Sequence, residues 1–333
     1  MDYTKLQNGS DIRGVAMEGI EGQHVNLTEQ ACRDIGRGFA LWLRARLGKD
    51  TLRVAVGRDS RLSGPQLALW LMEAMAAEGL QVTDLGMAST PAMFMSTVTE
   101  GFAFDASVMI TASHLPFNRN GYKFFTKDGG LEKQDIAAIL ALAGGSEHTG
   151  LPAGSIVTGS FMDTYAAQLR KKVQDAAGCE QPLAGMRIVV DAGNGAGGFY
   201  CAKVLEPLGA AHATGVDIDP KAEDIARENA AINQIFADRF TAVTGDVIGD
   251  KAMMESLKGH YDVVLANIVA DVIIPLSRVV PEFLQEDSIF ICSGILNTRL
   301  PEVLDALEKN GLQILSTEQQ EDWCRVTAAL LET

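Results

Sequence analysis

Short apolar, β-branched runs alternate with longer helical patterns along almost the whole chain, and this alternation limits its possible folds more than any other feature. Residues 52–56 and 186–190 have the composition of strands, and a helical pattern follows each of them. Repeated strand–helix units are typical of α/β folds with parallel strands. The pattern therefore predicts an α/β protein.

The length of the chain predicts two domains, because a domain takes about 150 residues and the chain has 333. Residues 144–159 are rich in Gly, Ser, Thr and Pro, which interrupt regular structure, so we expect a linker there. We accordingly expect a first domain at residues 1–150, a linker and helix at 151–182, and a second domain at 183–333.

The charge of the chain narrows the choice of partner. Lys and Arg number 28 and Asp and Glu number 43, which gives a formal net charge of −15. Nucleic-acid-binding modules normally carry the opposite sign, so we expect no nucleic-acid partner. An acidic surface favours a basic partner instead, but does not identify one.

Hydropathy and cysteine usage indicate where such a chain resides. The most apolar stretch, residues 261–276, contains Asp262, Asp271 and Pro275 and is not a clean membrane span, which takes about 20 apolar residues. Residues 1–11 have no apolar core, so we expect no signal peptide. The five cysteines form no C-x-x-C pair, which is typical of reduced thiols in a cytoplasmic protein.

The first candidate site is a serine loop at residues 111–123, directly after a predicted strand. Ligands of α/β folds bind at the carboxyl ends of strands. Ser113 has His114 beside it and Arg119 and Lys123 downstream, and such cations would offset the charge of a phosphorylated hydroxyl. By spacing alone, a polar loop serine is still more often structural than functional.

Three loops closely resemble domain one of the α-D-phosphohexomutases (phosphoglucomutase/phosphomannomutase): Asp11-Ile12-Arg13-Gly14, residues 57–61 and residues 111–123. The resemblance continues through residues 189–198 and ends near Ala210. It implies that a phosphoserine exchanges phosphate with a hexose phosphate inside a cluster of basic side chains. The residues so implied are Ser113, Arg13, Arg58, His114 and Lys123.

Three motifs of that family are missing from the sequence. They are the Asp-Gly-Asp-x-Asp-Arg metal loop, the Gly-Glu-x-Ser-Gly-His sugar loop and the Arg-x-Ser-x-Thr-Glu-Pro phosphate loop. Phosphoryl transfer needs charge neutralisation and a clamp on the distal phosphate. We therefore expect negligible isomerase activity, and the missing aspartate loop argues against Mg²⁺ as a cofactor.

The second candidate site is a glycine loop with two acids. A strand leads into Asp191 and a loop that contains the glycines Gly193, Gly195 and Gly197. Asp217 follows Gly197 by 20 residues, a spacing that lets a carboxylate accept both hydroxyls of a ribose. Asp246 follows the third strand and can reach an adenine edge. Because Gly193, Gly195 and Gly198 also fit the dinucleotide pattern G-x-G-x-x-G, a nicotinamide-dependent oxidoreductase stays open as a weaker alternative.

The chain after this loop resembles a different family. Residues 215–222, 226–230, 261–271 and 293–296 are very similar to the ribosomal protein L-eleven methyltransferases, class I enzymes that use S-adenosylmethionine. The resemblance implies that Asp217 holds the ribose, Asp246 the adenine end and Asn267 the methyl-accepting amine. It also implies a basic ribosomal protein as substrate, although the domain by which that family recognises its substrate is replaced here.

The two resemblances meet near Ala210, within a βαβ unit that both families share. We expect a phosphohexomutase-type α/β domain followed by a Rossmann-like class I methyltransferase sheet whose first βα unit comes from the mutase. The predicted function is a fusion of an incomplete phosphohexomutase with an S-adenosylmethionine-dependent protein methyltransferase domain. Two alternatives remain open: a phosphosugar-binding protein with phosphoserine at Ser113, and a fusion without function.

Overall fold

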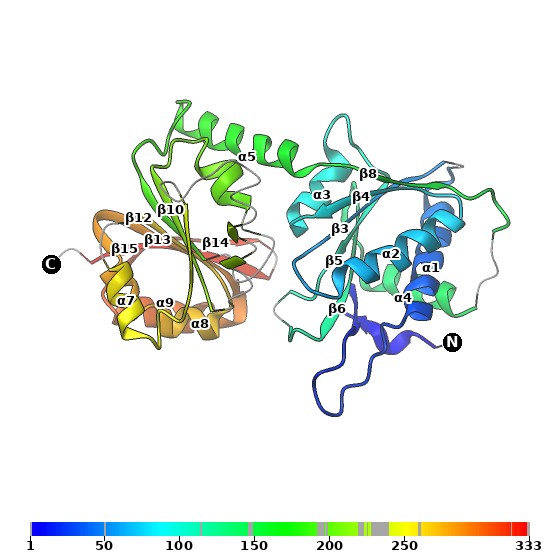
Figure 1. Ribbon diagram of the computed structural model, residues 1–333, viewed down its shortest axis with the longest axis horizontal. Coiled ribbons are helices and arrows are strands. Elements are labelled where there is room, and N and C mark those ends of the chain that lie inside the picture. The colour runs from blue at the N-terminus through cyan, green and yellow to red at the C-terminus, as the bar shows by residue number, and fades with distance from the viewer. Residues whose placement is uncertain are drawn as a thin grey trace. The chain divides into compact units, whose positions relative to one another are not determined.

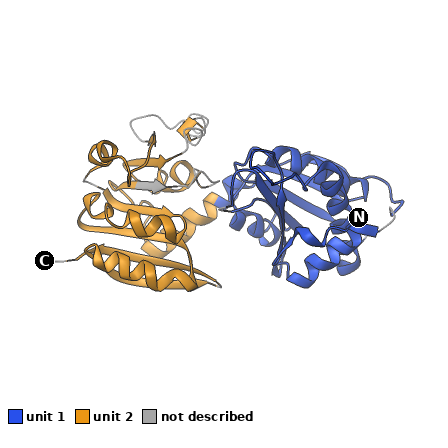
Figure 2. Cartoon of the chain, turned by 90° about the horizontal axis from the view of Figure 1, so that it is seen from below, with its two compact units in different colours: residues 1–165 blue, residues 166–333 orange. Residues whose placement is uncertain are grey.

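The computed structural model describes residues 2–49, 51–113, 115–145, 149–191, 197, 199–218, 223–224, 226–227, 240–258, 261–320 and 322–331. The chain divides into two compact units, Met1–Tyr165 and Ala166–Thr333 (Figure 2). Within the described residues, no helix is long and apolar enough to cross a membrane.

The first unit is built on one sheet with the strand order β1-β2-β6-β5-β3-β4-β8, and β7 pairs with β6 (Figure 1). The strands β3, β4, β5 and β8 are parallel, as the sequence predicts, whereas β1, β2, β6 and β7 pair antiparallel. A parallel crossover takes a dozen or more residues, and residues 111–118 between β5 and β6 are too few for one. The strand bounds are β1 (Gln7–Asn8), β2 (Asp11–Val15), β3 (Arg53–Arg58), β4 (Gln81–Met87), β5 (Ala106–Ile110), β6 (Arg119–Thr126), β7 (Gly129–Gly130) and β8 (Ser155–Thr158).

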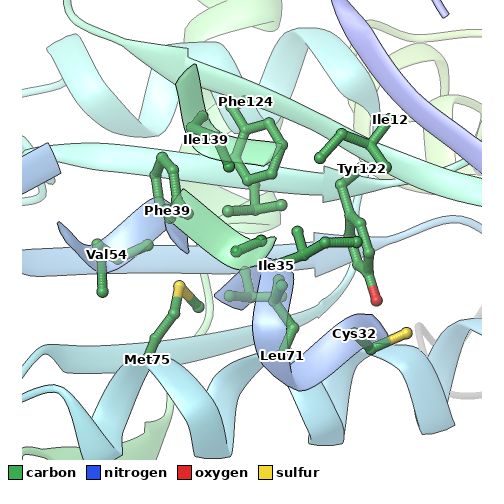
Figure 3. Packing of buried hydrophobic residues seen from close by; sticks show 14 of the residues in the cluster. Ile12, Cys32, Ile35, Phe39, Val54, Leu71, Met75, Tyr122, Phe124 and Ile139 are labelled. Atoms are coloured by element: carbon green, nitrogen blue, oxygen red, sulfur yellow. The ribbon is translucent and has the colours of Figure 1, made fainter. Parts of the chain in front are cut away.

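Helices cover both faces of this sheet. One face packs against α1 (Glu29–Leu47), α2 (Gly64–Ala77) and α4 (Lys133–Gly145), which share an apolar core with Tyr122 and Phe124 of β6 (Figure 3). On the other face, the Ser107 hydroxyl of β5 donates a hydrogen bond to the Met93 carbonyl of α3 (Thr90–Val98) at 2.6 Å. All five residues of β5 are buried, as expected for a strand covered on both sides.

Two polar residues that directly precede helices differ in whether their side chains cap the helix. The Thr28 hydroxyl caps α1 by accepting a hydrogen bond from the Ala31 N–H. Ser63 directly precedes α2, a position where a serine typically caps the helix, but its side chain makes no cap bond. It accepts from Asn120 Nδ2 at 2.9 Å instead, which ties the start of α2 to β6.

The segment expected to be the linker belongs in part to the first sheet. Strand β8 pairs with β4 from Gln81↔Ser155 to Asp84↔Thr158. Ahead of it, Thr149 donates its N–H and its hydroxyl to the buried Glu78 carboxylate, at 3.0 and 2.7 Å. The composition of residues 144–159 did not predict β8, because a short strand at the edge of a sheet needs only one neighbouring strand.

The second unit has the strand order β11-β10-β9-β12-β13-β15-β14, in which β15 is antiparallel to both neighbours. The chain moves outward from the central β9 to β10 and β11, and then returns to the other side of β9 at β12. Parallel strands of this kind place their carboxyl ends around one crevice. The bounds are β9 (Arg187–Asp191), β10 (His212–Asp217), β11 (Phe240–Thr244), β12 (Tyr261–Asn267), β13 (Leu284–Leu296), β14 (Leu312–Gln320) and β15 (Trp323–Leu330).

Among the described helices of this unit, one sequence prediction is wrong. The sequence pattern at residues 275–283 predicts a helix, but the structure has α8 (Ala270–Leu276) and a short turn, η4 (Val280–Glu282), instead. Pro281 would lie inside the expected helix, where proline removes a hydrogen bond and clashes with the preceding turn. The other helical elements are α5 (Met162–Ala177), the π-helix η3 (Cys201–Leu205), α7 (Lys251–Leu257), the short turn η5 (Asn297–Arg299) and α9 (Leu300–Lys309).

Candidate functional site

The serine loop is the connection between two antiparallel strands, β5 and β6. Ser113 is exposed just beyond the carboxyl end of β5 and has a positive φ of 53°, which is uncommon for a residue with a side chain. Its N–H donates to the Thr111 hydroxyl at 3.0 Å. His114, predicted beside it, lies outside the described residues.

Arg61 holds this loop in place through its carbonyl oxygens. Arg61 Nη2 donates to the carbonyls of Ser113 and Leu115 at 2.6 and 2.7 Å, and Nη1 donates to those of Pro116 and Arg119 at 2.8 and 3.0 Å. Burial lowers the pKa of the Arg61 guanidinium below its ordinary value, and the Asp59 carboxylate beside it acts in the opposite direction. Arg61 stands in the motif of residues 57–61 but was not among the residues that the resemblance implied.

Two of the predicted cations, Arg13 and Lys123, meet at Asp11. Arg13 Nη2 lies 2.7 Å from one Asp11 oxygen, and Lys123 Nζ lies 3.5 Å from the other. The Arg13 side chain is 9% exposed, and its buried Nη1 has no hydrogen-bond partner among the described residues. Buried N–H groups are rarely left without an acceptor. This cluster therefore has the donor capacity to bind an anion.

Gly121 makes room for this arrangement. A Cβ at Gly121 would lie 1.9 Å from the Ile12 carbonyl oxygen and 2.8 Å from Arg13 Cδ. Gly121 pairs with Arg13 across β2 and β6, so only a residue without a side chain permits this approach.

The other two predicted cations are placed differently. Arg58 ends β3 in register with Ile110 of β5, but its Nη1 approaches Asp84 Oδ1 at 3.9 Å. Arg119 begins β6, and its buried Nε has no partner among the described residues. The structure thus brings Arg13 and Lys123 together directly, and it places Arg119 at the start of β6, directly after the loop, and Arg58 at the end of β3, the neighbour of β5.

The second site is a cavity of about 400 Å³ in the second unit. Asp217, the last residue of β10, and Asp246, in the loop after β11, both line it. Gly245 N–H donates to the Asp217 carbonyl at 2.8 Å and joins the two segments, while Asp246 Oδ1 accepts from the Ile248 N–H at 2.9 Å. The rest of the lining is mostly apolar: Val216, Ile218, Gly245, Val247, Ile248, Leu257, Tyr261, Val264, Leu265, Ala266, Ile268, Val272, Leu276, Val280 and Phe283.

Asn267 is at the edge of this cavity. It is exposed at the end of β12, next to Ala266 and Ile268, which line the cavity. Asn267 is in register with Ser293 of β13, and the next residue, Gly294, has a φ of 83°. A Cβ at Gly294 would lie 2.9 Å from the Ile268 carbonyl oxygen and 3.3 Å from Asn267 Oδ1. Gly294, like Arg61, is therefore a site residue to which the sequence predictions gave no role. The sequence signal that pointed to it was its position in the segment 293–296.

The predicted glycine loop is only partly described. Asp191 ends the central strand β9, in register with Ala266 of β12, and Gly197 is also described. Gly193 and Gly195 lie outside the described residues. The ends of β9, β10 and β12 are neighbours, which is the arrangement that the spacing of Asp191 and Asp217 predicts.

A further carboxylate, Glu223, supports the end of β11. It accepts hydrogen bonds from the Thr244 N–H at 2.8 Å and from the Thr244 hydroxyl. These bonds hold the pKa of Glu223 below its ordinary value. Since Thr244 is in register with Asp217, Glu223 fixes the strand beside the cavity.

Two family models match the chain over separate segments. Residues 4–147 match the alpha/beta/alpha domain I of phosphoglucomutase/phosphomannomutase, and residues 177–330 match the ribosomal protein L11 methyltransferase (PrmA). A phosphoglucosamine mutase of Streptococcus pneumoniae is 33% identical over 259 residues, which cover 71% of this chain and 57% of that protein. The chain thus spans little more than half the length of this relative.

Two solved structures illustrate what the chain is similar to. A phosphoglucomutase/phosphomannomutase family protein of Burkholderia thailandensis has a TM-score of 0.50 and 27% identity, over 65% of this chain and 44% of that one. A ribosomal protein L11 methylase of Lactobacillus delbrueckii subsp. bulgaricus has a TM-score of 0.41 and 23% identity, over 56% of this chain and 91% of that one.

Proposed function

Because the chain is a fusion of a phosphohexomutase-type first part with a ribosomal protein L11 methyltransferase-type second part, we propose that its activity resides in the second part. That activity is the binding of S-adenosylmethionine and the transfer of its methyl group to an amine of a protein, with a basic ribosomal protein as the substrate class. The first part is an incomplete phosphohexomutase with negligible isomerase activity and no Mg²⁺ cofactor.

The observation that carries this proposal is the shared cavity of Asp217 and Asp246. Ribose hydroxyls and an exocyclic amine donate hydrogen bonds, and carboxylates at the two strand ends accept them. The apolar lining between the acids suits the faces of a purine. The residues present therefore fit the donor, with Asp217 at the ribose and Asp246 at the adenine end.

Asn267 would orient the amine that accepts the methyl group. S-adenosylmethionine supplies an activated methyl group when it is bound, and the transfer is a displacement that depends on the alignment of the attacking amine. The Asn267 amide oxygen accepts an N–H of that amine and directs its lone pair, and the close approach of Gly294 fixes the backbone beside it. An uncharged amine is needed, which a partly apolar site favours.

Calorimetric titration with S-adenosylhomocysteine tests donor binding. Asp217→Asn is expected to weaken binding by at least about tenfold, since a hydrogen bond to a charged group contributes about 1.5–3 kcal/mol. Asp305→Asn is the matched control, because Asp305 lies on the exposed side of α9, paired with Lys309. Absence of saturable heat with the unaltered chain would refute the proposal.

A second candidate function rests on the Arg13 cluster. Its unpartnered buried N–H and the Arg61-held loop favour a phosphorylated Ser113. Intact-mass analysis of the purified chain is expected to detect one phosphate that Ser113→Ala removes. If the phosphate persists in Ser113→Ala, or if no phosphate is found, this second candidate is wrong.

A further inference from the structure

Two large apolar side chains are exposed next to each other in the second unit. Leu296 is the last residue of β13 and is 40% exposed, and Trp323, in register with it, is the first residue of β15 and is 43% exposed. We call these two residues the apolar pair. Trp is highly buried on average and is enriched where proteins bind one another. An exposed Trp beside an exposed Leu therefore indicates a surface that a partner covers.

The apolar pair lies at the same edge of the sheet as Asn267. Strand β15 runs antiparallel to β13, so β15 begins where β12 and β13 end. Asn267 is in register with Ser293, which precedes Leu296 by three residues. Strand geometry gives about 10 Å along β13 and about 10 Å across two strand spacings, so the Cα atoms of Asn267 and Trp323 are roughly 14 Å apart. An extended peptide covers this distance in about four residues.

Short contacts connect the surroundings of the apolar pair with the mouth of the cavity. Val272 lines the cavity, and Oδ1 of the preceding residue, Asp271, lies 2.8 Å from Arg299 Nη2 in the turn that follows the pair. In the same turn, the Asn297 N–H donates to the Asp322 carbonyl at 2.8 Å, directly before β15. A partner segment that reaches the cavity mouth can therefore also contact the apolar pair.

Carboxylates outnumber cations on the described surface around the pair. Both cations are already in ion pairs: Arg299 with Asp271 and Glu302, and Arg325 with Glu318. Asp322, which is exposed, directly precedes Trp323. The charged residues of this surface are Asp271, Glu302, Glu318, Asp322, Arg299 and Arg325. The excess of negative charge favours a cationic occupant, as does the net charge of −15 of the chain.

We propose that the apolar pair binds an arginine side chain of the methyl-accepting protein, about four residues from the amine that Asn267 orients. The inference rests on the proposed function, because it takes Asn267 as the residue beside that amine. A guanidinium is planar and stacks on the face of an indole, and the methylene stem of an arginine packs on an apolar neighbour such as Leu296. The surrounding carboxylates offset the charge of the guanidinium.

Two pairs of fluorescently labelled peptides test this inference. Each peptide consists of Gly and Ser around a central lysine, with an arginine four residues before the lysine in one pair and four residues after it in the other. In the matched peptide of each pair, citrulline replaces the arginine and keeps its shape without its charge. Anisotropy titration of the full chain, saturated with S-adenosylhomocysteine, is expected to show about fivefold tighter binding of the arginine peptide in at least one pair.

The ratio of the two dissociation constants within that pair isolates the role of Trp323. Trp323→Ala is expected to bring the ratio to about one, because no aromatic face remains for the guanidinium. Leu315→Ala is the matched control, since Leu315 is an exposed apolar residue of β14 between the partners of Thr327 and Ala328, and the ratio is expected to stay at about fivefold. Titration of both variants with S-adenosylhomocysteine checks that the second unit remains folded.

The outcomes separate the inference from the proposed function. If the ratio is near one in both pairs, if no peptide binds, or if Trp323→Ala keeps the fivefold ratio, the inference is wrong, whereas saturable binding of S-adenosylhomocysteine keeps the proposed function. If S-adenosylhomocysteine does not bind to the unaltered chain, the proposed function is wrong and the inference fails with it.

Discussion

Among single residues, Arg61 has the largest expected effect on the serine loop. Arg61→Met removes four hydrogen bonds to carbonyls of residues 113–119 and is expected to lower the free energy of unfolding by about 2–4 kcal/mol. Urea unfolding measures this loss, and amide exchange in the loop is expected to speed up. Arg46→Met is the control, because the Arg46 side chain is exposed and its Nη1 lies 3.5 Å from Asp135 Oδ1. Equal stability of the two variants would contradict the role of Arg61.

Gly121 is a second position where one residue decides the geometry. Gly121→Ala is expected to lower the free energy of unfolding by about 3 kcal/mol or more, since its Cβ would collide with the Ile12 carbonyl. Gly145→Ala is the control, because a Cβ at Gly145 meets nothing within 4 Å. Chemical denaturation compares them, and a loss below about 1 kcal/mol for Gly121→Ala would show that β2 and β6 adjust freely.

The buried thiols predict how stability depends on pH. Burial raises the pKa of Cys201 and of Cys292 to about 12, and all five cysteines are free, with Cys179 alone exposed. An unfolded thiol has a pKa of about 8.5, so this contribution is complete below that pH and is lost as the pH rises toward 12. Between pH 9 and 10, Cys201 and Cys292 are each expected to reduce the free energy of unfolding by up to about 1.4 kcal/mol.

Urea unfolding at pH 8 and pH 10 measures this dependence. Cys292→Ala is expected to flatten it, whereas Cys179→Ala is expected to leave it unchanged. An equally steep dependence in Cys292→Ala would contradict the burial argument.

At the scale of elements, the contact between Thr149 and Glu78 holds the segment before β8. Thr149→Val removes the 2.7 Å hydrogen bond to a carboxylate that is 1% exposed, and is expected to cost about 1–3 kcal/mol. Amide exchange in β8 is expected to become faster than in Thr158→Val, the control in the same exposed strand. If both variants exchange at the same rate, β8 does not depend on this contact.

The elements that the sequence predicted well are those with strong local signals. Helix α1 begins after Thr28, and β3 and β5 follow apolar runs. The errors arose where a distant neighbour decides the structure: β6 turns back antiparallel through the serine loop, and Ser63 bonds to Asn120 instead of to its own helix. Periodicity carries no information on such partners.

The candidate sites show the same division between local and distant signals. Asp217 and Asp246 line one cavity, which is the placement expected where the strand ends of a parallel sheet meet at one edge, and their binding roles stay a prediction. The roles of Arg61 and Gly294 could not be predicted in this way. Arg61 binds backbone carbonyls that are remote in sequence, and Gly294 has an unusual backbone conformation. Arg58 lies at the expected strand end, yet Asp84 attracts its side chain.

At the scale of the whole molecule, each unit has apolar cores of its own. One core contains residues between 3 and 143, and the others contain residues between 166 and 328. We propose that the family boundary near Ala210 lies inside the second unit, so that a mutase-type βα unit and methyltransferase-type strands share one sheet. Because β9 pairs with both β10 and β12, a boundary near Ala210 would fall inside one continuous sheet.

Scanning calorimetry of the full chain, with and without S-adenosylhomocysteine, tests whether the second unit binds the donor. At about 100 times the dissociation constant, the ligand stabilises the unit that binds it by about 2.7 kcal/mol, which corresponds to roughly 5–10 °C. The transition of residues 166–333 is expected to rise by this amount and that of residues 1–165 to stay in place, and Asp217→Asn is expected to abolish the shift. A scan in which neither transition moves, or in which only that of the first unit moves, would contradict donor binding by the second unit.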